Sequence, residues 1–95
     1  VTARQAADWG LIWKCPPDDM LMDEARALAE RLANGPTIGY ALTKQAIHAA
    51  ATNTLNQQLD LEAQLQKTCG ESDDYAEGVS AFLAKRKPNF TGGRS

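Results

Sequence analysis

Residues 72–90 read SDDYAEGVSAFLAKRKPNF, which is the pattern of one helix with both of its ends marked. Ser72 suits the N-cap, because its hydroxyl can accept a hydrogen bond from the free N–H groups of the first turn. Two aspartates at 73–74 follow near the positive end of the helix dipole, and the basic run 85–87 lies near the negative end. Pro88 cannot continue a helix. The stretch therefore predicts a helix that begins after Ser72 and is stopped by Pro88.

Two helices are predicted in the first third of the chain. Thr2 can cap a short helix, and Gly10 suits the left-handed conformation that ends it. A brief apolar segment, read as extended, and a turn at a Pro-Pro pair come next. Asp18 or Asp19 then caps a second helix, which ends at an Asn-Gly-Pro sequence. The apolar residues of this helix recur at three- and four-residue spacing, as an amphipathic helix requires: Leu21, Ala25, Leu28, Ala29 and Leu32.

The middle of the chain predicts two further helices. The first spans about 37–52 and carries one apolar stripe, made of Ile38, Leu42, Ala46 and Ala49. The second runs to about Thr68, and Thr54 with Gln57 fits a capping box at its start. The leucines of the second helix do not share one face, which indicates two packing partners: Leu55, Leu59, Leu61 and Leu65.

These five helices predict an all-α fold, with a helical domain over 1–88 and a flexible tail over 89–95. A chain of 95 residues buries only about 60 to 65% of the surface that its unfolded form exposes, so its stability alone should be marginal. The chain begins with Val1 instead of Met and is already helical in pattern there. We therefore expect a fragment from which something upstream has been removed.

Composition excludes several classes of protein. Hydrophobic residues make up 43% of the chain and the net charge is -2, so a disordered tail and a nucleic-acid-binding protein are both disfavoured. Cys15 and Cys69 do not form a C-x-x-C pair, which argues against a disulfide framework or a zinc site. No apolar run is long enough to span a membrane, and the N-terminus lacks the pattern of a signal peptide. A cytoplasmic protein without a membrane or nucleic-acid partner is expected.

Few residues offer catalytic chemistry. Phosphate-binding loops, the H-E-x-x-H zinc motif and the G-x-S-x-G nucleophile motif do not occur in the sequence. His48 is the only histidine and has no obvious partner, so we interpret it as a surface or packing residue. Asp60 and Glu62 stand two apart on a helix and point in different directions, which does not make an acid–base pair. We therefore expect no catalytic residue and no metal ligand.

Phe82 and Lys85 form the most suggestive pair, because three positions along a helix place an aromatic ring and an ammonium on adjacent turns. Such a pair can stack on a base and neutralise a phosphate. The pattern alone leaves a second reading open, in which Phe82 is a core residue and the basic cluster only complements the helix dipole.

The stretch 73–90 resembles the E-G-x-x-A-F-x-x-K-R-x-P-x-F ending of the crotonase family, also called the enoyl-CoA hydratase/isomerase family. Two other segments agree in the same order. Residues 2–12, TARQAADWGLI, resemble the family pattern T-A-x-x-A-x-x-x-G-L-V, and Gly35-Pro36-Thr37 with Lys44 resembles a proline-to-lysine helix of the family. Within the family, several segments look like the ring-epoxide isomerases of phenylacetate degradation: DWGLIW at 8–13, TNTL at 52–55, QLDLE at 58–62 and GVSAFLAKR at 78–86.

The resemblance implies a division of labour. In the family, an N-terminal spiral of β-β-α turns carries the oxyanion-hole N–H groups and the catalytic acids, and the C-terminal helices cover the site and mediate trimer contacts. This chain resembles only the helical part, so the spiral core is absent from it and the isolated chain is expected to be inactive. Phe82 and Lys85 fall at positions that approach the coenzyme A nucleotide, often in a neighbouring subunit.

The implied function is that of the C-terminal helical region of an isomerase that converts ring-1,2-epoxyphenylacetyl-CoA to oxepin-CoA. Coenzyme A would enter as part of the thioester substrate, with no separate cofactor, and the complete enzyme would be a homo-oligomer, a trimer or a dimer of trimers. Three alternatives stay open from the sequence: an enoyl-CoA hydratase of the same family, a free-standing helical interaction module, and a small bundle that binds acyl-CoA alone.

Overall fold

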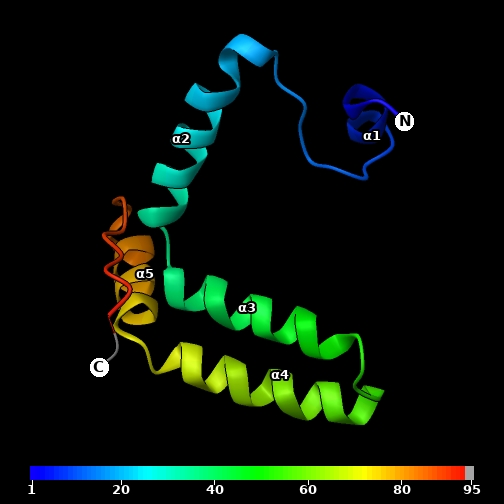
Figure 1. Cartoon of the computed structure of the whole chain (residues 1–95). Helices are drawn as coiled ribbons and strands as arrows, with labels where there is room; N and C mark the ends of the chain where they lie inside the picture. The colour runs from blue at the N-terminus through cyan, green and yellow to red at the C-terminus, as the bar shows by residue number, and fades with distance from the viewer. Residues whose placement is uncertain (94–95) are drawn as a thin grey trace. The chain divides into compact units, whose positions relative to one another are not determined.

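The structure, a computed structural model, describes residues 1–93 and divides into two compact units, Val1–Glu30 and Arg31–Ser95. Residues 1–93 contain helices and no strand, in the order α1, a 3-10 helix η1, and α2 to α5 (Figure 1). The predicted all-α fold of five α-helices is therefore confirmed. None of the helices in this described part is long and apolar enough to cross a membrane.

The first unit contains α1 (Ala3–Asp8), η1 (Asp18–Met20) and most of α2 (Leu21–Ala33). Thr2 caps α1 in a complete capping box with Gln5, and Gly10 adopts a positive φ of 78° just after the helix. Lys14 in the connecting segment makes an ion pair of 2.6 Å with Glu24 on α2. The connection between α1 and η1 is thereby tied to the second helix.

The prediction that Asp18 or Asp19 caps the second helix is wrong. Pro17 occupies the N-cap position of η1, makes no side-chain capping bond, and leaves both aspartates in the first turn. The acidic side chains can still interact favourably with the positive end of the helix there, which explains their presence without a capping role. The predicted end is confirmed, because α2 stops at Ala33, directly before the Asn-Gly-Pro sequence.

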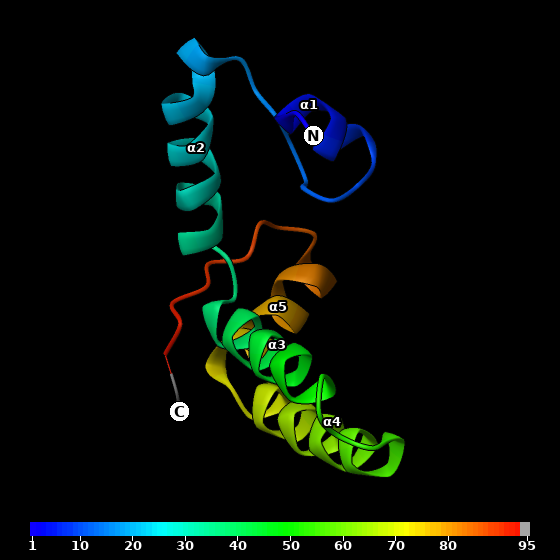
Figure 2. The ribbon, with the colours of Figure 1, turned by 45° about the vertical axis from the view of Figure 1, so that its right-hand side comes forward.

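The second unit contains α3 (Thr37–Ala50), α4 (Leu55–Gly70) and α5 (Asp73–Ala84). Helices α3 and α4 run side by side as an antiparallel hairpin (Figures 1 and 2). The predicted stripe on α3 is confirmed as its half-buried face, made of Ile38, Leu42, Ala46 and Ala49. Leu61 and Leu65 of α4 are half-buried, whereas Leu55 and Leu59 are exposed, so the two predicted apolar faces of α4 are real.

Gln58 joins the two helices of the hairpin. Its side-chain amide donates a hydrogen bond of 3.0 Å to the carbonyl oxygen of Ala46 on α3, and its carbonyl oxygen accepts one of 3.1 Å from Asn53. The predicted capping box at Thr54 and Gln57 is present at the start of α4. The turn between α3 and α4 is thus closed by polar contacts.

Very little of the described chain is core. Ala6 and Ala81 are the buried hydrophobic residues among residues 1–93, and the large apolar side chains are at least partly exposed. Buried polar residues are Ser72 and Asp74. In the described part, three α-helices have side-chain N-caps, at Thr2, Thr54 and Ser72, but neither unit has a hydrophobic core of large side chains.

Candidate functional site

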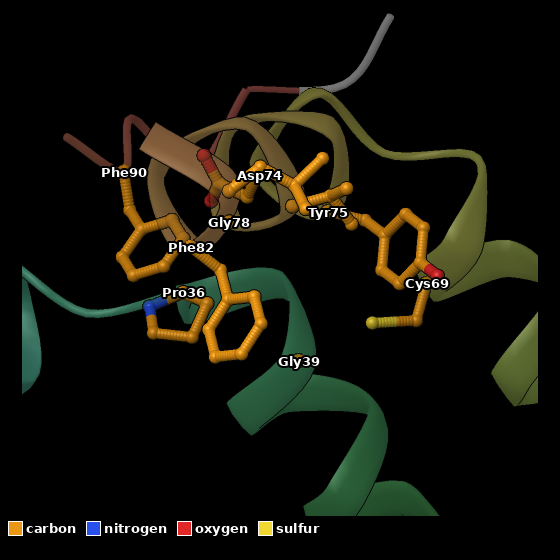
Figure 3. A pocket seen from close by; sticks show the side chains of 10 residues that line it. Pro36, Gly39, Cys69, Asp74, Tyr75, Gly78, Phe82 and Phe90 are labelled. Carbon is orange, nitrogen blue, oxygen red and sulfur yellow. The ribbon is translucent and has the colours of Figure 1, made fainter. Parts of the chain in front are cut away.

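An apolar groove lies within the second unit, where α5 meets the start of α3 and the end of α4 (Figure 3). Its volume is about 410 Å³. Helix α5 supplies six of its ten lining residues, and the other four come from the start of α3, the end of α4 and the segment after α5. The ten residues are Pro36, Gly39, Cys69, Asp74, Tyr75, Gly78, Val79, Phe82, Leu83 and Phe90. A second hollow of about 500 Å³ between α3 and α4 shares Pro36, Gly39 and Cys69 with the first.

Three aromatic rings border the groove. Tyr75 and Phe82 come from α5, and Phe90 comes from the segment that follows it (Figure 3). Phe82 is 83% exposed, so it forms an open wall and is not buried in a core. Phe82 is therefore not a core residue of the second unit, and its contact with a ligand stays a prediction.

The helix that carries Phe82 ends earlier than predicted. Helix α5 stops at Ala84, four residues before Pro88, because Lys85 adopts the left-handed conformation with a φ of 55°. The N–H of Lys85 donates to the carbonyl oxygen of Phe82 at 3.2 Å, and the N–H of Arg86 donates to that of Ala81 at 3.0 Å. These two bonds form a Schellman motif, which satisfies carbonyl groups of the last turn and ends the helix.

As a result, Phe82 and Lys85 do not lie on adjacent turns of one helix. Phe82 borders the groove, whereas Lys85 is exposed and is not among the residues that line it. Within residues 1–93, the ammonium of Lys85 has no ion-pair partner. Phe82 and Lys85 thus lie at the same end of α5, but the ring of Phe82 borders the groove and the ammonium of Lys85 lies outside it.

Two carboxylates on α5 accept hydrogen bonds from the residues that follow the helix, and these contacts were not predicted from the sequence. Asp74 is 3% exposed and accepts hydrogen bonds from the backbone N–H groups of Thr91, at 2.8 Å, and Gly92, at 3.0 Å. Its partners are 17 and 18 residues away. No local signal reveals such a contact, because it depends on where the chain returns after Pro88.

Glu77 is the second of these carboxylates. It accepts two hydrogen bonds from the guanidinium of Arg86, at 2.6 and 3.0 Å, and one from the backbone N–H of Asn89, at 2.7 Å. The bonds from Arg86, and next the bond from Asn89, lower the pKa of Glu77 to about 2. Arg86 is therefore paired with Glu77, in contrast to its neighbour Lys85, which has no ion-pair partner in the described chain.

The segment after Pro88 was predicted to be a flexible tail. Three of its backbone N–H groups, those of Asn89, Thr91 and Gly92, are held by the two carboxylates. Residues 94 and 95, which belong to the same predicted tail, lie outside the described residues. The flexibility of the tail stays a prediction, and so does the boundary at 88.

The other residues considered from the sequence are not assembled into a site. His48 is exposed in the last turn of α3, and Glu62 accepts a hydrogen bond of 2.9 Å from Gln58 on its own helix. Among residues 1–93, no group of three His, Cys, Asp or Glu side chains could hold a metal ion. The region offers an apolar groove, aromatic surfaces and a cation.

Comparison with known proteins relates the whole described chain to one family. The sequence profile of the enoyl-CoA hydratase/isomerase family matches residues 1–93. The chain is 56% identical over 92 residues to 1,2-epoxyphenylacetyl-CoA isomerase of Escherichia coli K12, and 36% identical over 90 residues to the mitochondrial enoyl-CoA hydratase of Pongo abelii. These alignments cover 97% and 95% of this chain, but only 35% and 31% of those proteins.

Solved structures agree with the sequence relatives. The enoyl-CoA hydratase of Polaromonas sp. JS666 superposes with a TM-score of 0.88 and 31% identity, over 96% of this chain and 35% of that one. This chain thus spans about a third of the length of its relatives and represents part of their fold. From the sequence profile, the shared sequence and the shared helical structure, we conclude that the chain belongs to the enoyl-CoA hydratase/isomerase, or crotonase, family and is an all-helical part of that fold.

Proposed function

We propose that this chain is the C-terminal helical region of a cytoplasmic acyl-CoA isomerase that converts ring-1,2-epoxyphenylacetyl-CoA to oxepin-CoA in phenylacetate degradation. The observation that carries the proposal is the 56% identity to the E. coli isomerase, compared with 35% to the 2,3-dehydroadipyl-CoA hydratase of the same bacterium over the same number of residues. In this role the chain contributes cover for the active site, contacts between subunits of a trimer or a dimer of trimers, and a coenzyme A contact. Catalytic groups are supplied by the rest of the enzyme.

The exposed apolar side chains support the proposed subunit and domain contacts. Trp9, Leu11 and Trp13 in the first unit, and Ile47, Leu55 and Leu59 in the second, are each at least 56% exposed. Large apolar side chains gathered on a surface usually mark contacts with other protein. Because the relatives are about three times as long as this chain, the residues that cover these side chains are proposed to belong to the rest of the enzyme and its neighbouring subunits.

The proposed coenzyme A contact consists of Phe82 and Lys85. The ring of Phe82 is 83% exposed, which leaves it free to stack on an adenine base. The ammonium of Lys85 has no ion-pair partner in the described chain and can neutralise a phosphate. Arg86, which is held by Glu77, is not available for the same task.

The substrate is tested with two hybrid enzymes. In one, this chain replaces the 92 matching residues of the E. coli isomerase; in the other, it replaces those of the E. coli 2,3-dehydroadipyl-CoA hydratase. We expect the isomerase hybrid to keep most of its parent's kcat/KM for ring-1,2-epoxyphenylacetyl-CoA, and the hydratase hybrid to lose most of its own parent's activity. Equal or better function in the hydratase host would contradict the isomerase assignment. A pair of folded but inactive hybrids would favour an interaction module instead.

The coenzyme A contact is tested with Phe82→Ala and Lys85→Ala in the isomerase hybrid. Loss of one stacked base costs about 1 to 3 kcal/mol, so we expect Phe82→Ala to raise KM by about 5- to 150-fold without a matching fall in kcat. Lys85→Ala should raise KM less, since its charge is exposed to water. Lys87→Ala, two positions from Lys85, is the matched control and should leave KM unchanged.

A further inference from the structure

The segment that follows α5 is bound to that helix by hydrogen bonds from its backbone to two carboxylates. We call residues 89–93 the strap. Its backbone N–H groups at Asn89, Thr91 and Gly92 donate to the carboxylates of Asp74 and Glu77, which come from one helix. Hydrogen bonds to a charged acceptor are about twice as strong as neutral ones. Two side chains of α5 thus fix three backbone positions of the strap.

Asp74 and Glu77 stand three residues apart, and side chains at this spacing lie on the same side of a helix. Asp74 is almost fully buried, at 3% exposure, and among the described residues its two partners are both in the strap. A buried carboxylate without these partners would be costly. The strap therefore supplies the hydrogen bonds that the buried carboxylate of Asp74 needs, and Asp74 in turn holds the strap.

Between the two anchors, Phe90 is brought over α5. Gly78 has no side chain, and a Cβ atom placed there would lie 3.6 and 3.8 Å from the Cε1 and Cζ atoms of the Phe90 ring. These are ordinary van der Waals distances for an added methyl group, so the ring of Phe90 lies beside Gly78 with room for no more than a small side chain there. From this position it borders the groove together with Phe82 (Figure 3).

The far end of the strap closely approaches α3. Gly92 has a positive φ of 71°, and a Cβ atom there would lie 2.5 Å from the hydroxyl oxygen of Thr37, the first residue of α3. A side chain at this position would force the Thr37 hydroxyl to move and would be strained by the positive φ, so glycine suits this close approach to α3. The strap extends from α5 to the start of α3, beside Pro36 and Gly39 of the groove.

We propose that Asp74 and Glu77 form a carboxylate clamp, which holds the strap on α5 and so fixes the ring of Phe90 as a wall of the groove beside Phe82. The two acids are positioning residues that act on the ligand through Phe90. Glu77 does not line the groove, and the carboxylate of Asp74, which is a lining residue, is held by the N–H groups of Thr91 and Gly92. The nature of the ligand, an acyl-CoA thioester, rests on the proposed function. The clamp itself rests on the contacts of the second unit alone.

The clamp is tested in the isomerase hybrid with Asp74→Asn and Glu77→Gln, which keep the size of each side chain and remove its charge. Asp73→Asn is the matched control, because Asp73 is exposed in the same turn and bonds nothing in the strap. Hydrogen exchange of the strap amides should become about tenfold faster in both clamp variants and stay unchanged in the control. Glu77 is partly exposed, so Glu77→Gln should fold even if Asp74→Asn does not.

The link to the groove is tested by steady-state kinetics on the same proteins. We expect each clamp variant to raise KM for ring-1,2-epoxyphenylacetyl-CoA severalfold with kcat unchanged, as Phe90→Ala should also do. Glu77→Gln combined with Phe90→Ala should be no worse than Phe90→Ala alone, because both changes act through one ring. General loosening of the fold would instead lower kcat as well, and would add to the effect of Phe90→Ala.

The outcomes separate the clamp from the proposed function. Unchanged strap exchange in both clamp variants would overturn the clamp, whatever the enzyme does. In a second outcome, the clamp variants exchange faster but keep the parental KM, while Phe82→Ala raises KM. This outcome would overturn the link between strap and groove and leave the coenzyme A contact in place. If Phe82→Ala also fails to raise KM, the coenzyme A contact and the link are both refuted, and exchange alone then supports the clamp as a device that orders the strap.

Discussion

At the scale of the residue, Lys85 is held in a conformation that suits glycine better. It is the non-glycine residue with a positive φ among residues 1–93, and it occupies the C′ position of α5. Replacement by glycine should relieve this strain and raise the free energy of unfolding by about 0.5 to 1 kcal/mol, although it removes the ammonium. We predict that Lys85→Gly in the isomerase hybrid raises the urea midpoint and also raises KM. Lys87→Gly, at a position without positive φ, should not raise the midpoint.

The pKa of Glu77 makes a second prediction at this scale. The bonds from Arg86 and Asn89 hold that pKa at about 2, against an ordinary value of 4.5. A depressed pKa in the folded state adds stability above the unfolded value, and this contribution is lost as the pH falls toward the folded value. The urea midpoint of the parent hybrid should therefore exceed that of Glu77→Gln at pH 7, and the gap should close as the pH falls from about 4.5 toward 2. A gap that is constant over this range would contradict the ion pair.

At the scale of the element, the helices could be predicted wherever both a cap and a stop are local. Thr2, Thr54 and Ser72 cap their helices as expected, since each capping bond reaches only three residues along the chain. The end of α5 was misjudged because Pro88 is a visible stop, whereas a left-handed lysine has no signal in the sequence. The sequence pointed to Phe82, whose role stays a prediction, but it did not predict the groove or the contacts of Asp74 and Glu77. Their contacts join residues 12 to 18 positions apart or on different helices.

The start of α4 provides the prediction for this scale. The hydroxyl of Thr54 accepts from the N–H of Gln57 at 3.2 Å, and the side chain of Gln57 accepts from the N–H of Thr54 at 2.9 Å. Thr54→Ala removes the first of these bonds and should cost about 1 kcal/mol. Urea unfolding of the isomerase hybrid should show the loss as a lower midpoint, whereas Thr54→Ser should keep the parental value. Equal midpoints for the alanine and serine variants would show that the cap contributes nothing.

At the scale of the whole molecule, the chain has far more apolar surface than core. Ala6 and Ala81 are its buried hydrophobic residues in the described part, while side chains as large as Trp13, Ile47 and Leu55 are about two-thirds exposed or more. Hydrophobic burial is the main force that opposes the entropy of the unfolded chain, at about 25 cal/mol per Å² of apolar surface removed from water. Helix caps worth about 1 kcal/mol each cannot replace it. Within each unit, buried apolar surface therefore contributes little to the stability of these helices.

The isolated chain should consequently behave differently from the same residues in a hybrid. We predict that alone it binds a fluorescent apolar dye such as ANS, unfolds with low cooperativity, and self-associates as its concentration rises, because its apolar faces have no other partner. In the isomerase hybrid these signs should disappear. Dye fluorescence would measure the exposed apolar surface, urea unfolding the cooperativity, and light scattering after size exclusion the self-association. Leu59→Glu places a charge on the exposed face of α4, and should reduce self-association of the isolated chain while disrupting assembly of the hybrid. An isolated chain that is monomeric, cooperative and free of dye would show that its helices are stable without the rest of the fold.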